Sequence, residues 1–178
     1  VEAAWIARVV KRPVQLQWTR EDDMKNGFSR PAAWHHFRAG LGSDGRRSAF
    51  DHHFVTFGHN GEPVSGATLS SGHYPAGLVP NFRLRQSQVE CNIRTGPWRS
   101  PGHSAYCWAY QGFFDEVALA AGKDPLEFRL DLLSKAYGEP PIDLDRAAGT
   151  LRKAAEAAAW GRDPGPGRGL GLAFHFDH

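Results

Sequence analysis

Hydrophobic positions in the second half of the chain recur at helical spacing. From Ser104, a suitable N-cap, one predicted helix face collects small and apolar residues, namely Ala105, Trp108, Ala109, Gly112, Phe113, Val117 and Ala120. Gly122 then marks a helix end. A second helix is predicted to begin at Asp124-Pro125, where aspartate caps and proline takes the first turn, and a third to cover 143–160. The pattern therefore predicts three helices within 104–161.

Alternating polar and apolar residues in the first half predict half-buried strands. The expected strands are 14–19, 32–41, 47–57 and 82–93, with a last one within 168–176. The Gly-Ser-Asp-Gly turn at 42–45 joins two of them as an antiparallel hairpin. Residues 1–11 and 21–26 are expected to be helical, and 58–80 to form a long loop. Strands in a segment 12–93 followed by helices predict an α+β fold.

Composition narrows the class of protein. The 178 residues are 41% hydrophobic and 22% charged, which is typical of one globular domain, and no apolar run approaches the roughly 20 residues that cross a bilayer. A net charge of +2, from 21 basic and 19 acidic residues, argues against a nucleic-acid partner. Cys91 and Cys107 alone do not ligate an iron–sulfur cluster, so any cluster belongs to another chain. Because neither end has the character of a natural terminus, we interpret the chain as an internal piece of a longer polypeptide.

The loop before the first of the three helices is the main candidate site. Residues 96–104 read Gly-Pro-Trp-Arg-Ser-Pro-Gly-His-Ser. A loop that turns into a helix start directs free backbone N–H groups to one point, and Arg99 adds a cation. The sequence therefore predicts an anion-binding cradle. The alternative is an ordinary connection in which proline and glycine serve turn geometry alone.

Four blocks in order resemble the molybdenum-binding large subunit of the xanthine dehydrogenase and aldehyde oxidase family, in the branch similar to the isoquinoline 1-oxidoreductase beta subunit. The blocks are residues 12–24, 29–33, 95–104 and 114–130. The resemblance implies that 1–178 is a fragment of one molybdopterin-binding domain, with 94–104 as its cofactor loop. It implies oxidative hydroxylation of an N-heteroaromatic ring or an aldehyde with water-derived oxygen, and electron transfer to an iron–sulfur small subunit. The fragment alone is expected to be inactive.

The resemblance also implies which residues form the site. A molybdopterin dinucleotide, expected in its cytosine form, would be held by Trp98, Arg99, Ser100, Pro101, Gly102, His103 and Ser104. Pro101 stands where xanthine- and aldehyde-oxidising members place an aromatic residue against the substrate, so a purine-like substrate loses support. Arg30 matches a substrate-binding position, although a surface ion pair with Glu21 or Asp22 is the alternative. The glutamate base is expected outside this chain, and both a cytoplasmic and a periplasmic location stay open.

Two other hypotheses come from the histidines and the tryptophans. His35, His36, His52 and His53 fall on the two hairpin strands, where Asp51 or His73 would complete the site of a non-redox metal-binding module. This alternative fails if His36 lies far from His52 and His53. A third hypothesis is an interaction domain anchored by four large aromatic residues, Trp5, Trp18, Trp34 and Phe37.

Overall fold

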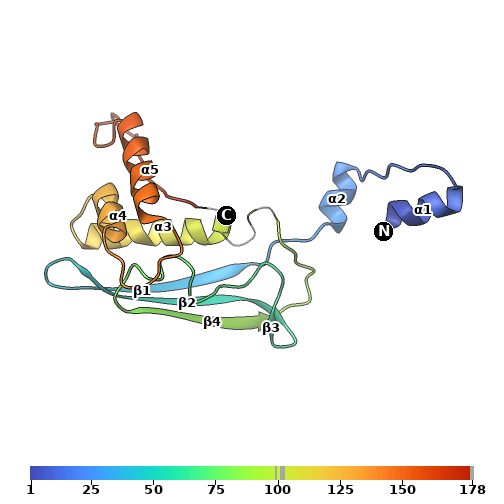
Figure 1. Cartoon of the computed structure of the whole chain (residues 1–178), viewed down its shortest axis with the longest axis horizontal. Coiled ribbons are helices and arrows are strands. Elements are labelled where there is room, and N and C mark those ends of the chain that lie inside the picture. Colours follow the sequence, from blue (N-terminus) through green and yellow to red (C-terminus); the bar gives the residue numbers. More distant parts are fainter. Residues whose placement is uncertain (99, 101–102, 177–178) are drawn as a thin grey trace.

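A four-stranded sheet with three helices on one side of it forms the body of the protein, and the last of these helices rises from the one before it, away from the sheet (Figure 1). The structure, a computed structural model, describes residues 1–98, 100 and 103–176, with the backbone alone at 103–105. The strands are β1 (Ala33–Leu41), β2 (Arg47–His59), β3 (Glu62–Pro63) and β4 (Phe82–Glu90). The three helices are α3 (His103–Ala120), α4 (Pro125–Leu133) and α5 (Leu144–Ala157). The α+β prediction and the three predicted helices are confirmed.

Strand β2 is the centre of the sheet. It pairs antiparallel with β1, so the predicted hairpin is confirmed, and Trp34 lies opposite Val55 in the register. Strand β4 lies on the other side of β2 and runs parallel to it. The parallel direction follows from the long connection after β3, which returns the chain to the start of β2, where the backbone N–H of Phe50 bonds to the carbonyl of Asn81 at 2.8 Å.

The core lies between β2 and α3. Phe54 meets Tyr106 edge to face with ring centroids 5.4 Å apart, and Phe50 meets Phe114 at 5.9 Å. The predicted inner face of α3 is therefore partly wrong, because Trp108 is 82% exposed. The side of α3 that contains Tyr106 and Phe114 faces the sheet instead. The tyrosines are buried there because most of the surface of a tyrosine side chain is its apolar ring.

Two predicted strands are absent from the described residues. Residues 14–19 and 168–176 have no regular secondary structure. The second segment is instead held by side-chain contacts, since the thiol of Cys107 donates to the carbonyl of Phe174 at 3.1 Å. Alternation of polar and apolar residues makes a strand only where a neighbouring strand supplies hydrogen bonds, and neither segment has such a neighbour in the described part of the chain.

The N-terminal arm extends away from the body (Figure 1). It contains α1 (Glu2–Val10) and α2 (Arg20–Asn26), so both N-terminal helix predictions are confirmed. Trp5 of α1 lines an apolar cleft of about 470 Å³ with Leu16 and Trp18, and the three residues are 42–60% exposed. None of the described helices is long and apolar enough to span a bilayer.

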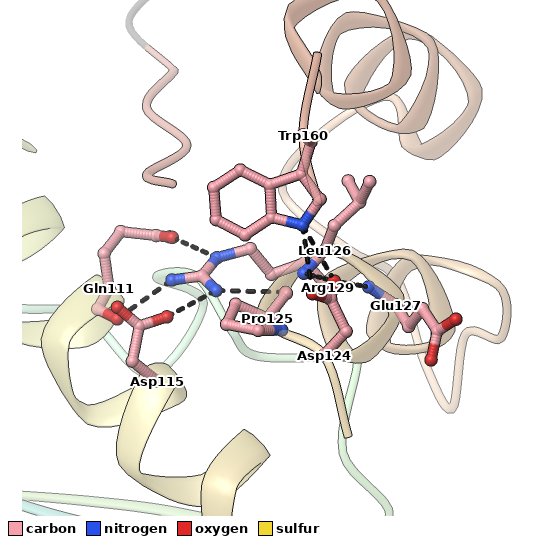
Figure 2. A network of polar contacts seen from close by, with 8 residues as sticks. All are labelled: Gln111, Asp115, Asp124, Pro125, Leu126, Glu127, Arg129 and Trp160. Carbon is pink, nitrogen blue, oxygen red and sulfur yellow. Dashed lines mark hydrogen bonds and ion pairs between the residues drawn. The ribbon is translucent and has the colours of Figure 1, made fainter. Parts of the chain in front are cut away.

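A buried arginine joins α4 to α3. Arg129 is 1% exposed, and its guanidinium donates to the side chain and the carbonyl of Gln111 at 2.7 and 3.0 Å (Figure 2). It also donates to Asp115 at 2.7 Å and to the carbonyl of Pro125 at 3.1 Å. Four bonds from one guanidinium satisfy a charge that would be costly to bury alone.

The side chains of Asp124 and Asp143 cap the N-termini of α4 and α5. Asp124 accepts from the backbone N–H of Leu126 at 2.8 Å, and Trp160 donates to the same carboxylate at 3.0 Å, which ties the end of α5 to the start of α4 (Figure 2). Asp143 accepts from the N–H of Arg146 at 3.0 Å. The bond to Asp124 confirms the predicted N-cap of α4, whereas the predicted N-cap Ser104 is wrong because α3 already begins at His103.

Replacing the buried arginine tests the α3–α4 connection. We expect Arg129→Ala to lower the free energy of unfolding by about 3 kcal/mol, because it removes four hydrogen bonds and leaves Gln111 without its partner. Chemical denaturation measures the change. The control Arg152→Ala removes an exposed arginine of α5 and should change the value by less than about 0.5 kcal/mol. Equal effects of the two substitutions would contradict this role.

Candidate functional site

Two segments far apart in the sequence meet just before the candidate loop. Ser29 and Thr95 form a parallel bridge. The N–H of Ser29 donates to the carbonyl of Arg94 at 3.2 Å, and the N–H of Gly96 donates to the carbonyl of Ser29 at 3.1 Å. Ser29 belongs to one of the four blocks that carry the family resemblance, and Thr95 and Gly96 belong to another. The backbone therefore holds the start of the candidate loop in place.

The close approach at this junction depends on a glycine. A Cβ atom added at Gly96 would lie 2.9 Å from the Cβ of Phe28, closer than packed side chains allow. The indole N–H of Trp98 then donates to the carbonyl of Phe28 at 2.7 Å. The indole ring is thus fixed over the junction while 56% of its surface stays exposed.

Cations and aromatic rings share the exposed side of the junction. The guanidinium carbon of Arg30 lies 5.9 Å from the Trp98 ring centroid, and that of Arg94 lies 4.7 Å from the Phe28 ring. The structure therefore brings together Arg30 and Trp98, two residues predicted to form the site. Of the alternative partners of Arg30, Asp22 accepts a 2.7 Å hydrogen bond from Thr19 at the start of α2.

The remaining predicted loop positions are described only in part. Ser100 is half-buried and has a φ of 54°, a left-handed conformation that is uncommon for serine. Arg99, Pro101 and Gly102 lie outside the described residues, as do the side chains of His103 and Ser104, whose backbone forms the first turn of α3. The amide cradle over 98–104 stays a prediction.

The described groups fit an anionic ligand that has a flat aromatic part. The 18-residue helix α3 places the positive end of its dipole at the end of the loop. Arg30 and Arg94 add positive charge on the junction side, and Trp98 offers an exposed ring face. Cations beside an exposed aromatic ring are groups that can bind a phosphate-bearing heterocycle.

Two of the four hairpin histidines form a buried hydrogen-bonded chain. His35 Nδ1 lies 2.9 Å from His52 Nε2, and His52 Nδ1 lies 2.8 Å from the hydroxyl of Tyr110 on α3. Desolvation lowers the pKa of His35 to about 4 and that of His52 to about 3. Because burial also raises the pKa of Tyr110, we assign the phenol as donor to His52, which in turn donates to His35.

The other two histidines lie on the outer face of the sheet. The rings of His36 and His53 are 6.1 Å apart, so the proximity that a metal site needs is present, and His53 Nε2 lies 2.8 Å from the hydroxyl of Ser87. Further metal ligands are missing, because the described residues include no group of three or more His, Cys, Asp or Glu side chains placed to hold a metal ion. The metal-binding alternative loses its support within that part of the chain.

The two residues expected to complete a metal site are engaged elsewhere. Asp51 accepts from Arg83 at 2.7 Å and from Arg85 at 3.0 Å, and the hydrogen bond from Arg83 lowers the pKa of Asp51 to about 2. His73 Nδ1 lies 2.8 Å from the hydroxyl of Ser70, on a loop apart from the hairpin. Neither side chain joins His36.

Sequence reasoning missed Phe28 and Arg94 at the junction. No periodicity marks either residue, because both lie in irregular chain beside a short bridge. The order of the resemblance blocks was the only signal, since residues 29–33 and 95–104 both match one family. The approach of His35 to His52 across the hairpin was predicted, but the burial of this pair was not, because alternation along a strand does not say which face a helix covers.

The buried histidine pair predicts a loss of stability in acid. Both imidazoles are neutral in the folded protein, whereas in the unfolded chain they titrate near 6.5. Below that pH the unfolded chain binds more protons, so the free energy of unfolding should fall between pH 6.5 and 4, by at most roughly 1.4 kcal/mol per pH unit for each histidine. Denaturation at several pH values measures the slope.

A double variant, His35→Gln with His52→Gln, should flatten this dependence, whereas His53→Gln on the outer face should preserve it. An unchanged slope in the double variant would show that other groups cause the loss.

Comparison with known proteins places these residues in a family. The sequence profile of the molybdopterin cofactor-binding domain matches residues 1–132. The chain is 32% identical over 128 residues to the aldehyde oxidoreductase molybdenum-binding subunit PaoC of Escherichia coli (strain K12), covering 72% of this chain and 17% of that protein. It is 27% identical over 187 aligned positions to the isoquinoline 1-oxidoreductase subunit beta of Brevundimonas diminuta, covering 98% and 23%.

The name of a third relative refers to a different cofactor. The membrane-bound aldehyde dehydrogenase [pyrroloquinoline-quinone] of Gluconacetobacter polyoxogenes is 30% identical over 187 positions, covering 91% of this chain and 24% of that protein. The chain therefore spans about a quarter or less of the length of these three relatives.

Proposed function

Because the chain belongs to the molybdopterin cofactor-binding domain family, we propose that it is part of a molybdenum hydroxylase subunit and contributes one wall of the cofactor site. The observation that carries the proposal is the junction of Ser29 with Arg94 and Gly96. It fixes the entrance of the 94–104 loop and sets Trp98 and Arg30 side by side.

The residues of this chain bind and orient. In the proposed complex, backbone N–H groups within 98–104 and the start of α3 donate to the anionic dinucleotide, which we propose to be the cytosine form. Trp98 presents its exposed face to the heterocycle, and its bond to the carbonyl of Phe28 prevents the ring from turning away. When bound, the cofactor would supply the molybdenum chemistry for hydroxylation with oxygen from water.

Arg30 has the second proposed role, as a substrate-binding residue. Its guanidinium lies over Trp98, so it reaches the same space as the proposed heterocycle. A fixed cation there stabilises negative charge that develops on a substrate during hydroxylation. We propose an N-heteroaromatic ring or an aldehyde as substrate, in agreement with the names of two relatives. The glutamate base and the iron–sulfur clusters that receive electrons would come from polypeptide outside these residues.

Cofactor analysis tests the proposal directly. The native protein, purified from cells supplied with molybdate together with any subunit that copurifies, should contain equimolar molybdenum and pterin. We expect Trp98→Ala to lower pterin retention about tenfold, because it removes a stacking face. The control Trp5→Ala changes an exposed tryptophan of α1 and should keep the pterin. Purified protein without molybdenum and without pterin would refute the assignment.

Replacing Arg30 distinguishes a role in substrate binding from a role in cofactor binding. In the active enzyme we expect Arg30→Gln to lower kcat/KM by about 100-fold while molybdenum content is kept, because the cation acts on the substrate. The exposed Arg20, at the start of α2, provides the control Arg20→Gln with unchanged kcat/KM. Loss of molybdenum in place of turnover would assign Arg30 to the cofactor.

A further inference from the structure

Strand β1 is a free edge of the sheet. Among the described strands it pairs only with β2, so along its nine residues every second pair of backbone groups points away from the sheet. The opposite edge, β4, is charged by Arg83 and Arg85, the pattern that natural proteins use to block pairing. Strand β1 has Arg38 as its only fully charged residue and is otherwise rich in aromatic and small side chains.

Helix α3 packs against β1 beside this edge, where the Phe37 and Phe113 rings stack with centroids 4.9 Å apart. A groove of about 890 Å³ runs along the edge, lined by Phe37 and Arg38 of the strand and by Trp108 and Gly112 of the helix. Trp108 is 82% exposed, and nothing lies within 4 Å of the position where a Cβ of Gly112 would stand. One side of α3 next to the β1 edge is therefore left open.

We propose that the β1 edge accepts an extended β-strand from polypeptide outside these 178 residues, which inserts beneath α3 and widens the sheet. Residues of that strand that face α3 would be aliphatic, because they would lie between Phe37 and the exposed ring of Trp108. Residues that face the other way would lie beside His36 and Arg38 on the outer face of β1.

The charge of Arg38 indicates which residue type the incoming strand would place beside it on the outer face of the sheet. The cross-strand neighbour of Arg38 is Asp51, which is already bonded to Arg83 and Arg85. Within the described part of the chain, Arg38 takes part in no ion pair, so an acidic residue on the incoming strand would complement it.

The same charges argue against a second copy as the occupant. In a symmetric antiparallel pair centred on Phe37, each Arg38 would lie opposite a His36, without any acidic partner. The relatives are at least four times as long as the part that this chain matches, so polypeptide beyond these residues is available in such proteins.

A designed strand peptide tests the proposal on the whole chain. The probe is a capped nine-residue peptide that alternates valine and glutamate, and its control replaces every glutamate with lysine. We expect the glutamate peptide to bind about tenfold more tightly than the lysine peptide and to shift the backbone amide NMR signals of 33–41. Methylating the backbone nitrogens along one edge of the peptide should abolish binding.

Matched variants keep the test specific. Arg38→Glu should reverse the preference between the two peptides, whereas Arg152→Glu makes the same charge change on α5 and should leave it intact. Failure of the glutamate peptide to bind, or binding that leaves the β1 signals unmoved, would overturn the proposal. A concentration-dependent dimer with shifted β1 signals would assign the edge to a second copy and overturn it equally.

Discussion

The structure depends on the aromatic contact between β2 and α3. Phe50 and Phe54 of the central strand meet rings of α3, and the hydrogen bond of 2.8 Å between His52 and Tyr110 fixes the helix along its axis within that apolar layer. Burying such rings contributes most of the stability of a domain of this size. Because the candidate loop leads directly into α3, this contact also positions the functional site, and Arg129 attaches α4 to α3.

Features with local causes could be predicted from the sequence. Asp124 caps the helix that follows it, the third helix starts next to Asp143 as predicted, and Gly122 has a φ of +64° after the end of α3. The glycine-flanked turn at 42–45 places β1 against β2 in the same way. Each of these signals acts over a few residues, so the rest of the chain is not needed to interpret them.

Features that depend on distant partners could not be predicted. The inner face of α3 is set by the rings of β2, which is why Trp108 is exposed against expectation. The junction of Ser29 with Gly96 joins two irregular segments, and only the family resemblance placed them in one site. The family resemblance also suggested Arg30 and Trp98. No periodic pattern in the sequence indicates that these two residues lie close together.

The central claim is that the junction and the loop that follows it form one wall of a molybdopterin site. The most direct measurement is a crystal structure of the cofactor-loaded protein, with anomalous scattering recorded at the molybdenum absorption edge. The account predicts pterin density against Trp98 and the backbone of 98–104, with Arg30 facing the substrate space beside it. A cofactor bound where it touches none of these residues would contradict the account.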